Sequence, residues 1–259
     1  MKRQYVFVVV TLVLVAACTT PPSPTESPPT ATVSTRPKNT PPPTATAIIT
    51  STEGTIVEAG HLGLPLPFQQ GELFSTSGAC AVCHTKTVDD AGADVSIDAN
   101  WRSTIMANAA RDPYWQASVR AEVLENPDLA LVIEDRCATC HMPMARFTLF
   151  ANDEQGKVFG SGFVDPESQL HTLAMDGVSC SLCHQVRETG LGLSSSYSGG
   201  FIIDTGLRSP NRVIFGPYTI DNRLTRIMQN SSGFRPEQGL HLSGSELCAS
   251  CHTLYTPYV

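Results

Sequence analysis

Cys80-Ala81-Val82-Cys83-His84 is the stretch on which the fold depends, because the same Cys-x-x-Cys-His pattern occurs four times in the chain. The other copies occupy 137–141, 180–184 and 248–252. In such a pattern the two thiols match the two vinyl groups of one haem, and the histidine that follows lies under the iron as its proximal ligand. The expected thioether cysteines are Cys80, Cys83, Cys137, Cys140, Cys180, Cys183, Cys248 and Cys251, and the expected proximal ligands are His84, His141, His184 and His252.

Paired cysteines also bind zinc or form redox disulfides, but neither use requires a histidine after every pair. Here a histidine follows all four pairs, although the whole chain has only seven histidines. The four patterns use eight of the nine cysteines, and the ninth is Cys18. The sequence therefore predicts four covalently bound haem c groups. We expect the apoprotein to be poorly ordered, because cofactor binding is then coupled to folding.

The N-terminus has the features of an export signal. Lys2 and Arg3 give it a positive start, and the apolar run 6–17 is short for a membrane span. Small residues directly before Cys18 are typical of a bacterial lipobox, in which the cysteine is lipid-modified after cleavage. A plain signal peptide with a chance cysteine and an uncleaved anchor are the alternatives. We expect residues 1–17 to be a lipoprotein signal peptide and the protein to be tethered outside a bacterial membrane, in the periplasm or at the cell surface.

Residues 18–55 are dominated by Thr, Pro, Ser and Ala. Such a segment buries too little apolar surface to fold, so we expect a disordered linker. The remainder, 56–259, would be one tetrahaem domain, since its motifs are too irregularly spaced for a repeat solenoid. The formal net charge of −7 and the lack of a basic patch argue against binding to nucleic acid, and acidity would suit a redox partner with a basic docking face.

Helix start signals dominate the first half of this domain. Asp98 or Asn100 can cap a first helix that continues to Ala109. Asp112-Pro113 is typical of an N-cap followed by proline at the first helical position. The stretch from 100 to 141 is therefore expected to be the longest helical part of the chain.

The second motif is expected at the end of a helix over 127–140, which Asn126-Pro127 would start. Ser243 and Glu246 form a capping-box pattern just before the fourth motif. The Gly- and Ser-rich stretch 190–218 contains two short apolar runs and predicts a surface hairpin or loop. The expected fold class is mainly α with much irregular coil and little β, as a multihaem cytochrome c fold built around its haems.

The number of histidines limits the distal iron ligands. Beyond the four proximal histidines the chain has His61, His171 and His241, so at most three haems can be bis-histidine haems. The fourth iron must use another residue or keep an open position. Met106 is the best candidate for it, although a methionine at helical spacing is also an ordinary core residue.

Three segments resemble the multihaem cytochromes c that include the tetrahaem electron carrier of nitrifying bacteria and, more distantly, multihaem nitrite reductase and hydroxylamine oxidoreductase. They are His171 with 176–180, His241 with 245–248, and the helical stretch 101–110. In that family a similar helix often carries Ser-x-His-Ala with a distal-ligand histidine, and Met106-Ala107 stands there in this chain. The resemblance implies a His/Met haem of higher potential or a weak sixth position. The resemblance also implies that the protein continues after the fourth motif, so a sequence truncated at its C-terminus remains an open alternative.

Haems with two axial ligands pass electrons and offer no site to a substrate. We therefore expect an electron carrier between redox proteins, such as a membrane quinol-oxidising complex or a soluble carrier. The alternative is an oxidoreductase that acts on a small nitrogen or sulfur compound at one open haem. No catalytic residues are evident for it, because Arg111, Asp112 and Tyr114 are better explained as a solvated helix boundary. A reaction-centre haem subunit is disfavoured, because no methionine lies between Met1 and Cys80.

Overall fold

The computed structural model describes residues 66–255. The expected signal peptide 1–17, the lipidation site Cys18, the linker 18–55 and the candidate ligand His61 lie outside the described residues. About half of the structure is helical and 8% is strand. The expectation of a mainly α chain with much irregular coil and little β is confirmed at this level.

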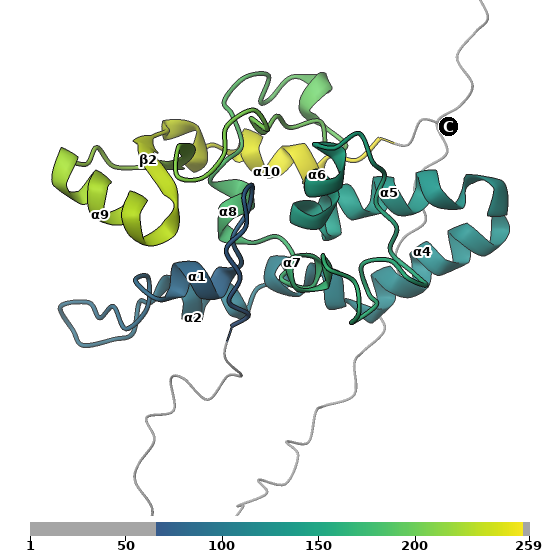
Figure 1. Ribbon diagram of the computed structural model, residues 1–259, viewed down its shortest axis with the longest axis horizontal. Helices are drawn as coiled ribbons and strands as arrows, with labels where there is room; N and C mark the ends of the chain where they lie inside the picture. Colours follow the sequence, from purple (N-terminus) through teal and green to yellow (C-terminus); the bar gives the residue numbers. More distant parts are fainter. Residues whose placement is uncertain (1–65, 256–259) are drawn as a thin grey trace, which may run out of the picture. The chain divides into compact units, whose positions relative to one another are not determined.

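Ten α-helices and two strands follow one another along the described residues (Figure 1). The helices are α1 (Ser77–Ala81), α2 (Ile97–Arg102), α3 (Ile105–Asn108), α4 (Pro113–Glu125), α5 (Ala130–His141), α6 (Pro143–Phe150), α7 (His171–Met175), α8 (Cys180–Cys183), α9 (Asn222–Ser232) and α10 (Ser245–His252). The strands are β1 (Arg212–Gly216) and β2 (Phe234–Gln238). Short 3-10 turns lie at Ala109–Arg111 (η1), Pro127–Leu129 (η2), Ser194–Ser196 (η3) and Leu240–Ser243 (η4).

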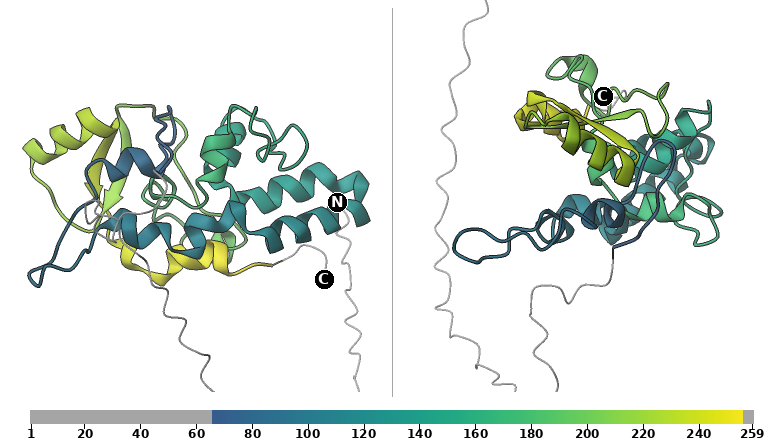
Figure 2. Two further views of the ribbon diagram at one scale, coloured as in Figure 1. Left: turned by 90° about the horizontal axis from the view of Figure 1, so that it is seen from below. Right: turned by 60° about the vertical axis from the view of Figure 1, so that its left-hand side comes forward.

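Helices α4 and α5 lie side by side in both Figure 1 and Figure 2. Asp112 caps α4 as expected, since its Oδ1 accepts a hydrogen bond from the Tyr114 N–H at 2.9 Å. The second expected start is displaced: Asn126 provides no side-chain cap, η2 intervenes, and α5 begins at Ala130. Helix α5 ends at His141, because the residue before Pro143 is disfavoured from helical geometry.

The expected first helix through Ala109 is divided into α2, α3 and η1. Asp98 and Asn100 do not cap it; the residue before α2 is Ser96, and it makes no side-chain cap bond. Thr104 explains the division. Its hydroxyl donates to the Trp101 carbonyl at 2.7 Å and accepts from the Ala107 N–H at 3.2 Å, so a new helix begins there.

The expected surface hairpin in 190–218 is wrong. Strand β1 pairs in parallel with β2, and α9 forms the crossover between them. The other apolar run is buried, at Phe201 and Ile203, and Ile203 bridges to Val186. Turn residues within 190–218 therefore separate two core-forming segments with different partners.

The expected capping box before the fourth motif is also wrong. Gly244 precedes α10 and no side chain caps the helix, while Ser243 is the last residue of η4.

The hydrophobic core is built around Phe74, Met142, Met144 and Leu182. Within residues 66–255, none of the helices combines the length and the apolar character needed to cross a membrane.

Candidate haem-attachment sites

All four Cys-x-x-Cys-His motifs lie on helical turns. Helices α5 and α10 end with the second and fourth motifs, and α8 is formed by the third. In the first motif the His84 N–H donates to the Cys80 carbonyl at 3.1 Å, which continues the turn begun in α1. Residues at i, i+3 and i+4 share one face of a helix. Each motif therefore presents two thiols and one imidazole on the same side, the arrangement that attachment of one haem requires.

Backbone carbonyls orient two of the expected proximal ligands. His141 Nδ1 lies 3.2 Å from the Ala109 carbonyl, and His184 Nδ1 lies 2.6 Å from the Phe215 carbonyl. Because a carbonyl only accepts, Nδ1 carries the proton and Nε2 is the nitrogen that remains for a metal. Burial lowers the pKa of His141, which favours the neutral, metal-binding form of the ring.

Two expected distal histidines are held in the same manner, but through different nitrogens. His171 Nδ1 lies 3.0 Å from the Phe163 carbonyl, which leaves Nε2 as its free nitrogen. His241 Nε2 lies 2.9 Å from the Val186 carbonyl, so Nδ1 is its free nitrogen. Its ring also meets Phe215 edge-on, with centroids 5.0 Å apart. The ring of His241 therefore contacts residues that lie beside the third motif, Val186 and Phe215, although the fourth motif follows it in sequence.

Met106 differs from the core methionines. Met142 and Met144 are fully buried, whereas the side chain of Met106 is 44% exposed. Its backbone carbonyl accepts a hydrogen bond from the Val178 N–H at 3.0 Å, two residues before Cys180. Core packing therefore does not account for Met106, and it lies next to the segment that leads into the third motif.

The motifs face one another in two pairs. The side chains of Cys80 and Cys180 lie close enough for each to alter the pKa of the other, and this proximity raises the pKa of Cys80. A matching contact joins Cys140 and Cys251 and raises the pKa of Cys140. These contacts show how the motifs are arranged: the first motif lies opposite the third, and the second lies opposite the fourth.

The third and fourth motifs join the two pairs. Burial, together with the neighbouring thiols of Cys251 and Cys248, raises the pKa of Cys183 to about 12. In Figure 1, α8 lies between α1 and α10. The spatial order is therefore first, third, fourth, second, which the sequence did not indicate.

Gly199 allows the close approach of the second and fourth motifs. Its N–H donates to the Ser250 carbonyl at 2.7 Å, and its φ of +81° lies in the left-handed region. A Cβ at this position would lie 2.6 Å from Thr139 Cγ2 and 3.6 Å from Cys140 Sγ. Only glycine combines this backbone conformation with this lack of space. Nothing in the sequence marked the position.

Trp115 was also missed by sequence reasoning. Its indole stacks on the imidazole of His141, with centroids 4.4 Å apart and planes 5° from parallel. The side chain is buried in the first turn of α4. The His141 ring is thus fixed from its face by Trp115 and from its edge by the Ala109 carbonyl.

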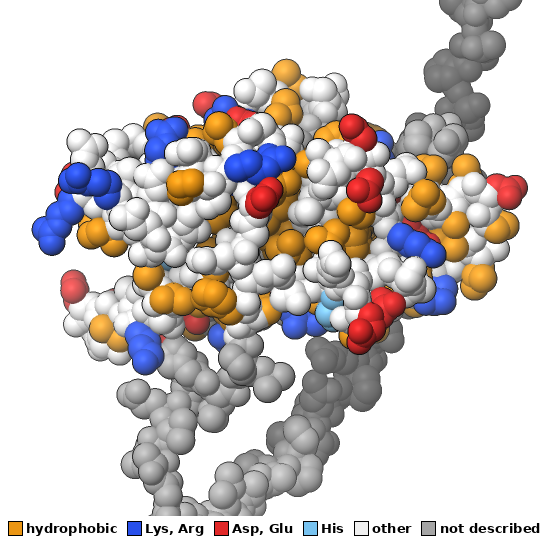
Figure 3. All heavy atoms as spheres, in the orientation of Figure 1, with side chains coloured by type: hydrophobic (Ala, Val, Ile, Leu, Met, Phe, Trp, Pro, Cys, Tyr) orange, Lys and Arg blue, Asp and Glu red, His pale blue; other side chains and the backbone are white. Residues whose placement is uncertain are grey.

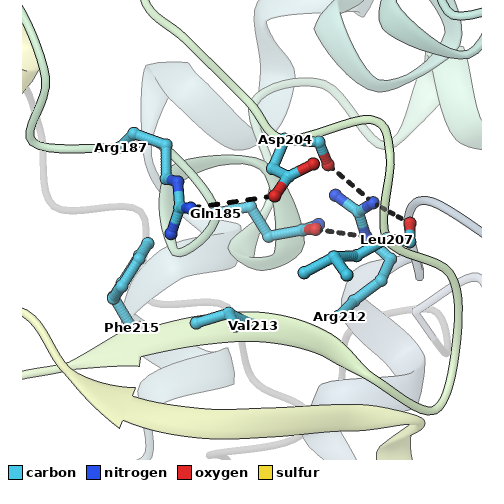
Figure 4. A pocket seen from close by; sticks show the side chains of 7 residues that line it. All are labelled: Gln185, Arg187, Asp204, Leu207, Arg212, Val213 and Phe215. Atoms are coloured by element: carbon cyan, nitrogen blue, oxygen red, sulfur yellow. Dashed lines mark hydrogen bonds and ion pairs between the residues drawn. The ribbon is translucent and has the colours of Figure 1, made fainter.

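A buried arginine ties β1 to the residue that follows the third motif (Figure 4). Arg212 Nε donates to Gln185 Oε1 at 2.5 Å, and Nη1 donates to the carbonyls of Asp204 and Leu207 at 2.8 and 2.7 Å. Burial lowers the pKa of Arg212 to about 10. Gln185 also donates to the Leu73 carbonyl at 3.0 Å, so the network reaches the segment before the first motif.

The residues around the motifs fit a flat, apolar cofactor. Within 66–255, no three His, Cys, Asp or Glu side chains gather as a metal site. A haem needs only axial protein ligands, because the porphyrin supplies the other four. Several large apolar residues near the motifs are exposed, including Val82 inside the first motif and Ile105 beside Met106. Figure 3 shows apolar side chains gathered in the middle of one face.

No known protein family, no curated protein and no solved structure matches this chain.

Proposed function

We propose that this chain is an extracytoplasmic, lipid-anchored tetrahaem c-type cytochrome that transfers electrons between redox protein partners. One observation carries the proposal: four Cys-x-x-Cys-His motifs lie on helical turns and meet in the order first, third, fourth, second. Haem c, when bound, supplies iron that alternates between ferric and ferrous states. The resemblance of the sequence to multihaem cytochromes c supports the same function.

In this proposal each protein group has a positioning task. The cysteines of each motif would form the thioethers and the histidine would bind iron, through Nε2 in His141 and His184. The carbonyls of Ala109 and Phe215 hold two of the imidazoles in place. The candidate distal ligands of the irons are His171, His241, Met106 and His61, of which His61 lies outside the described residues. Short separations between attachment sites favour transfer from one cofactor to the next.

The proposed location rests on the sequence alone. Cys18, after a short apolar run, would carry the lipid, and residues 18–55 would hold the domain away from the membrane. The acidic chain suits a basic partner surface, either on a quinol-oxidising membrane complex or on a soluble carrier.

Mass spectrometry of the full chain, expressed in a bacterium that matures c-type cytochromes, tests the proposal. We expect the mass of the polypeptide plus four haems, and one haem fewer after each double Cys→Ala change in a motif. Cys18→Ser is the control: it should keep all four haems and release the protein from the membrane fraction. A protein that binds zinc through these cysteines, or carries no covalent haem, would contradict the proposal.

Electron paramagnetic resonance of the oxidised protein separates the carrier from the alternative oxidoreductase. A carrier should show only low-spin ferric signals, and Met106→Ala should convert one of them to high-spin. A high-spin signal in the wild-type protein would instead indicate an open position and favour the enzyme. An unchanged spectrum and four unchanged potentials in Met106→Ala would remove Met106 from the ligands.

A further inference from the structure

A buried carboxyl lies between the first and third motifs. Asp176 is fully buried at the end of α7, four residues before Cys180. Its Oδ2 accepts a hydrogen bond from the Ser77 N–H at 2.7 Å, and Oδ1 lies 2.6 Å from Ser77 Oγ. Ser77 is the first residue of α1, which carries Cys80. Asp176 therefore joins the two segments that would hold a facing pair of haems.

Two further buried serines join the same two segments. Ser181 Oγ accepts from the Ser75 N–H at 3.1 Å and donates to the Ser75 carbonyl at 2.6 Å. Ser179 Oγ is also buried, with no partner at regular hydrogen-bond geometry. It nevertheless lies close enough to the Asp176 carboxyl to lower its pKa, against the effect of burial. Hydroxyl groups therefore approach the carboxyl both from α1 and from the segment before the third motif.

The contact with Ser77 suits both protonation states. When Asp176 is ionised, both the Ser77 N–H and the Ser77 hydroxyl can donate to it. When Oδ1 is protonated, the same hydroxyl can rotate and accept, since a hydroxyl is both donor and acceptor. A proton can therefore arrive or leave without stranding a buried polar atom.

The charges that face Asp176 leave it without a fixed counter-ion. Among residues 66–255 it forms no ion pair. Arg111 on η1 favours the ionised form, but its effect is small beside that of burial, and burial raises the pKa of Asp176. Cys80 and Cys180 face it from α1 and α8 and lose their charge as thioethers. Arg146 on α6 is paired with Asp135, and His171 begins the helix that Asp176 ends.

We propose that Asp176 is a proton-binding site coupled to reduction of the two haems attached by the first and third motifs, an inference that rests on the proposed function. One electron arrives from a redox partner and converts one ferric iron to ferrous. One proton arrives from solvent and forms the O–H bond on Asp176 Oδ1; no other bond forms or breaks. Added negative charge nearby favours the neutral carboxyl, so the two events assist each other.

Spectroelectrochemical titration of the holoprotein over pH about 4 to about 9 tests this coupling. In the wild type, the potentials of one or two haems should fall as pH rises, by at most about 59 mV per pH unit for one proton per electron. Asp176→Asn should abolish that slope. The reduced-minus-oxidised infrared spectrum should contain the carbonyl stretch of a protonated carboxyl in the wild type only. A slope that persists in Asp176→Asn overturns the proposal and assigns the proton to another group, such as a haem propionate.

Two further variants keep the test decisive. Asp135→Asn changes a buried carboxyl that Arg146 neutralises at 3.0 Å, and it should leave the slope unchanged. Ser77→Ala keeps the Asp176 carboxyl but removes its hydroxyl donor. The pH range over which the haem potentials fall should therefore move to higher pH. If this pH range is the same in Ser77→Ala as in the wild type, the proposal is overturned, even if Asp176→Asn does not fold. Absence of covalent haem, by contrast, would refute the proposed function before any slope is measured.

Discussion

At the scale of single residues, the hydrogen bonds of the histidines are more informative than their number. His141, His184 and His171 each use Nδ1 to bond a carbonyl, whereas His241 uses Nε2. The three nitrogens left free on the first group are the ones that reach furthest from the backbone. We infer that His241 would bind iron, if it is a ligand, in a different ring orientation from the others.

Trp115 provides a residue-scale prediction. Trp115→Ala removes a buried indole and the stacking on His141, so the free energy of unfolding should fall by about 3–5 kcal/mol. Trp115→Phe should lose less and keep the stacking. Chemical denaturation measures the stability, and paramagnetic resonance should show one altered low-spin signal in the alanine variant. Tyr114→Ala is the control on the same turn, since Tyr114 is 80% exposed; equal effects of the two alanine variants would contradict the assigned role.

Asp176 provides a second prediction at this scale. Burial raises the pKa of Asp176 above its ordinary value of 3.8. A carboxyl whose pKa is raised in the folded state contributes stability below the unfolded pKa and loses it as pH rises through the folded pKa. The free energy of unfolding of the wild type, relative to Asp176→Asn, should therefore decrease as pH rises above about 4. Denaturant titrations of both proteins at several pH values check this, and an increase would show that the carboxylate is the preferred form.

At the scale of elements, the sequence correctly predicted those helix boundaries that depend only on neighbouring residues. The Asp112-Pro113 helix start is correct, because the cap bonds a backbone group two residues away. The first helix failed because Thr104 forms competing local bonds that periodicity does not reveal. The surface hairpin failed because β1 finds its partner beyond α9. Pairing between distant segments is set by tertiary packing, which a pattern within one segment does not contain.

Gly199 gives the prediction for this scale. Gly199→Ala combines a positive φ, which costs about 1–3 kcal/mol for a residue with a side chain, with a collision against Thr139. Gly92→Ala is matched to it, because Gly92 has the same φ of +81° and no atom within 4 Å of the added Cβ. We expect Gly199→Ala to lower the thermal midpoint more than Gly92→Ala does. Adding Thr139→Ser should recover part of the difference, and equal midpoints would show that the approach to Thr139 is not tight.

At the scale of the whole molecule, the sequence could place the four motifs but not their arrangement. Each motif is local, with all its chemistry within five residues, as in 80–84. The facing pairs depend on contacts across much longer separations, such as Cys80 with Cys180. Asp176 and Gly199 contact residues far away in the sequence, Ser77 and Thr139, so local patterns do not reveal these contacts.

Removal of haem gives the whole-molecule prediction. Expressed without haem maturation, the chain should lack a cooperative thermal transition, because ligand binding and folding are coupled. Both tryptophans report on this. Trp101 Nε1 donates to the Val178 carbonyl near the third motif at 3.1 Å, and Trp115 stacks on His141. We expect their fluorescence to be strongly quenched in the holoprotein and recovered in the apoprotein; bright fluorescence from a four-haem protein would contradict the arrangement.

The crossed pairing of the motifs has a consequence for how the protein is made. Residues 80–141 hold the first two motifs, and each of them lies opposite a motif that comes after residue 179. An exported chain emerges from its N-terminus, so neither early motif can meet its counterpart until much later residues have crossed the membrane. If the chain binds four haems as proposed, we expect that splitting it between 141 and 180 would not yield two self-sufficient dihaem proteins. In the proposed tetrahaem protein, we expect the nascent segment that holds the first two motifs to depend on chaperones and on the haem-ligating machinery until the fourth motif arrives.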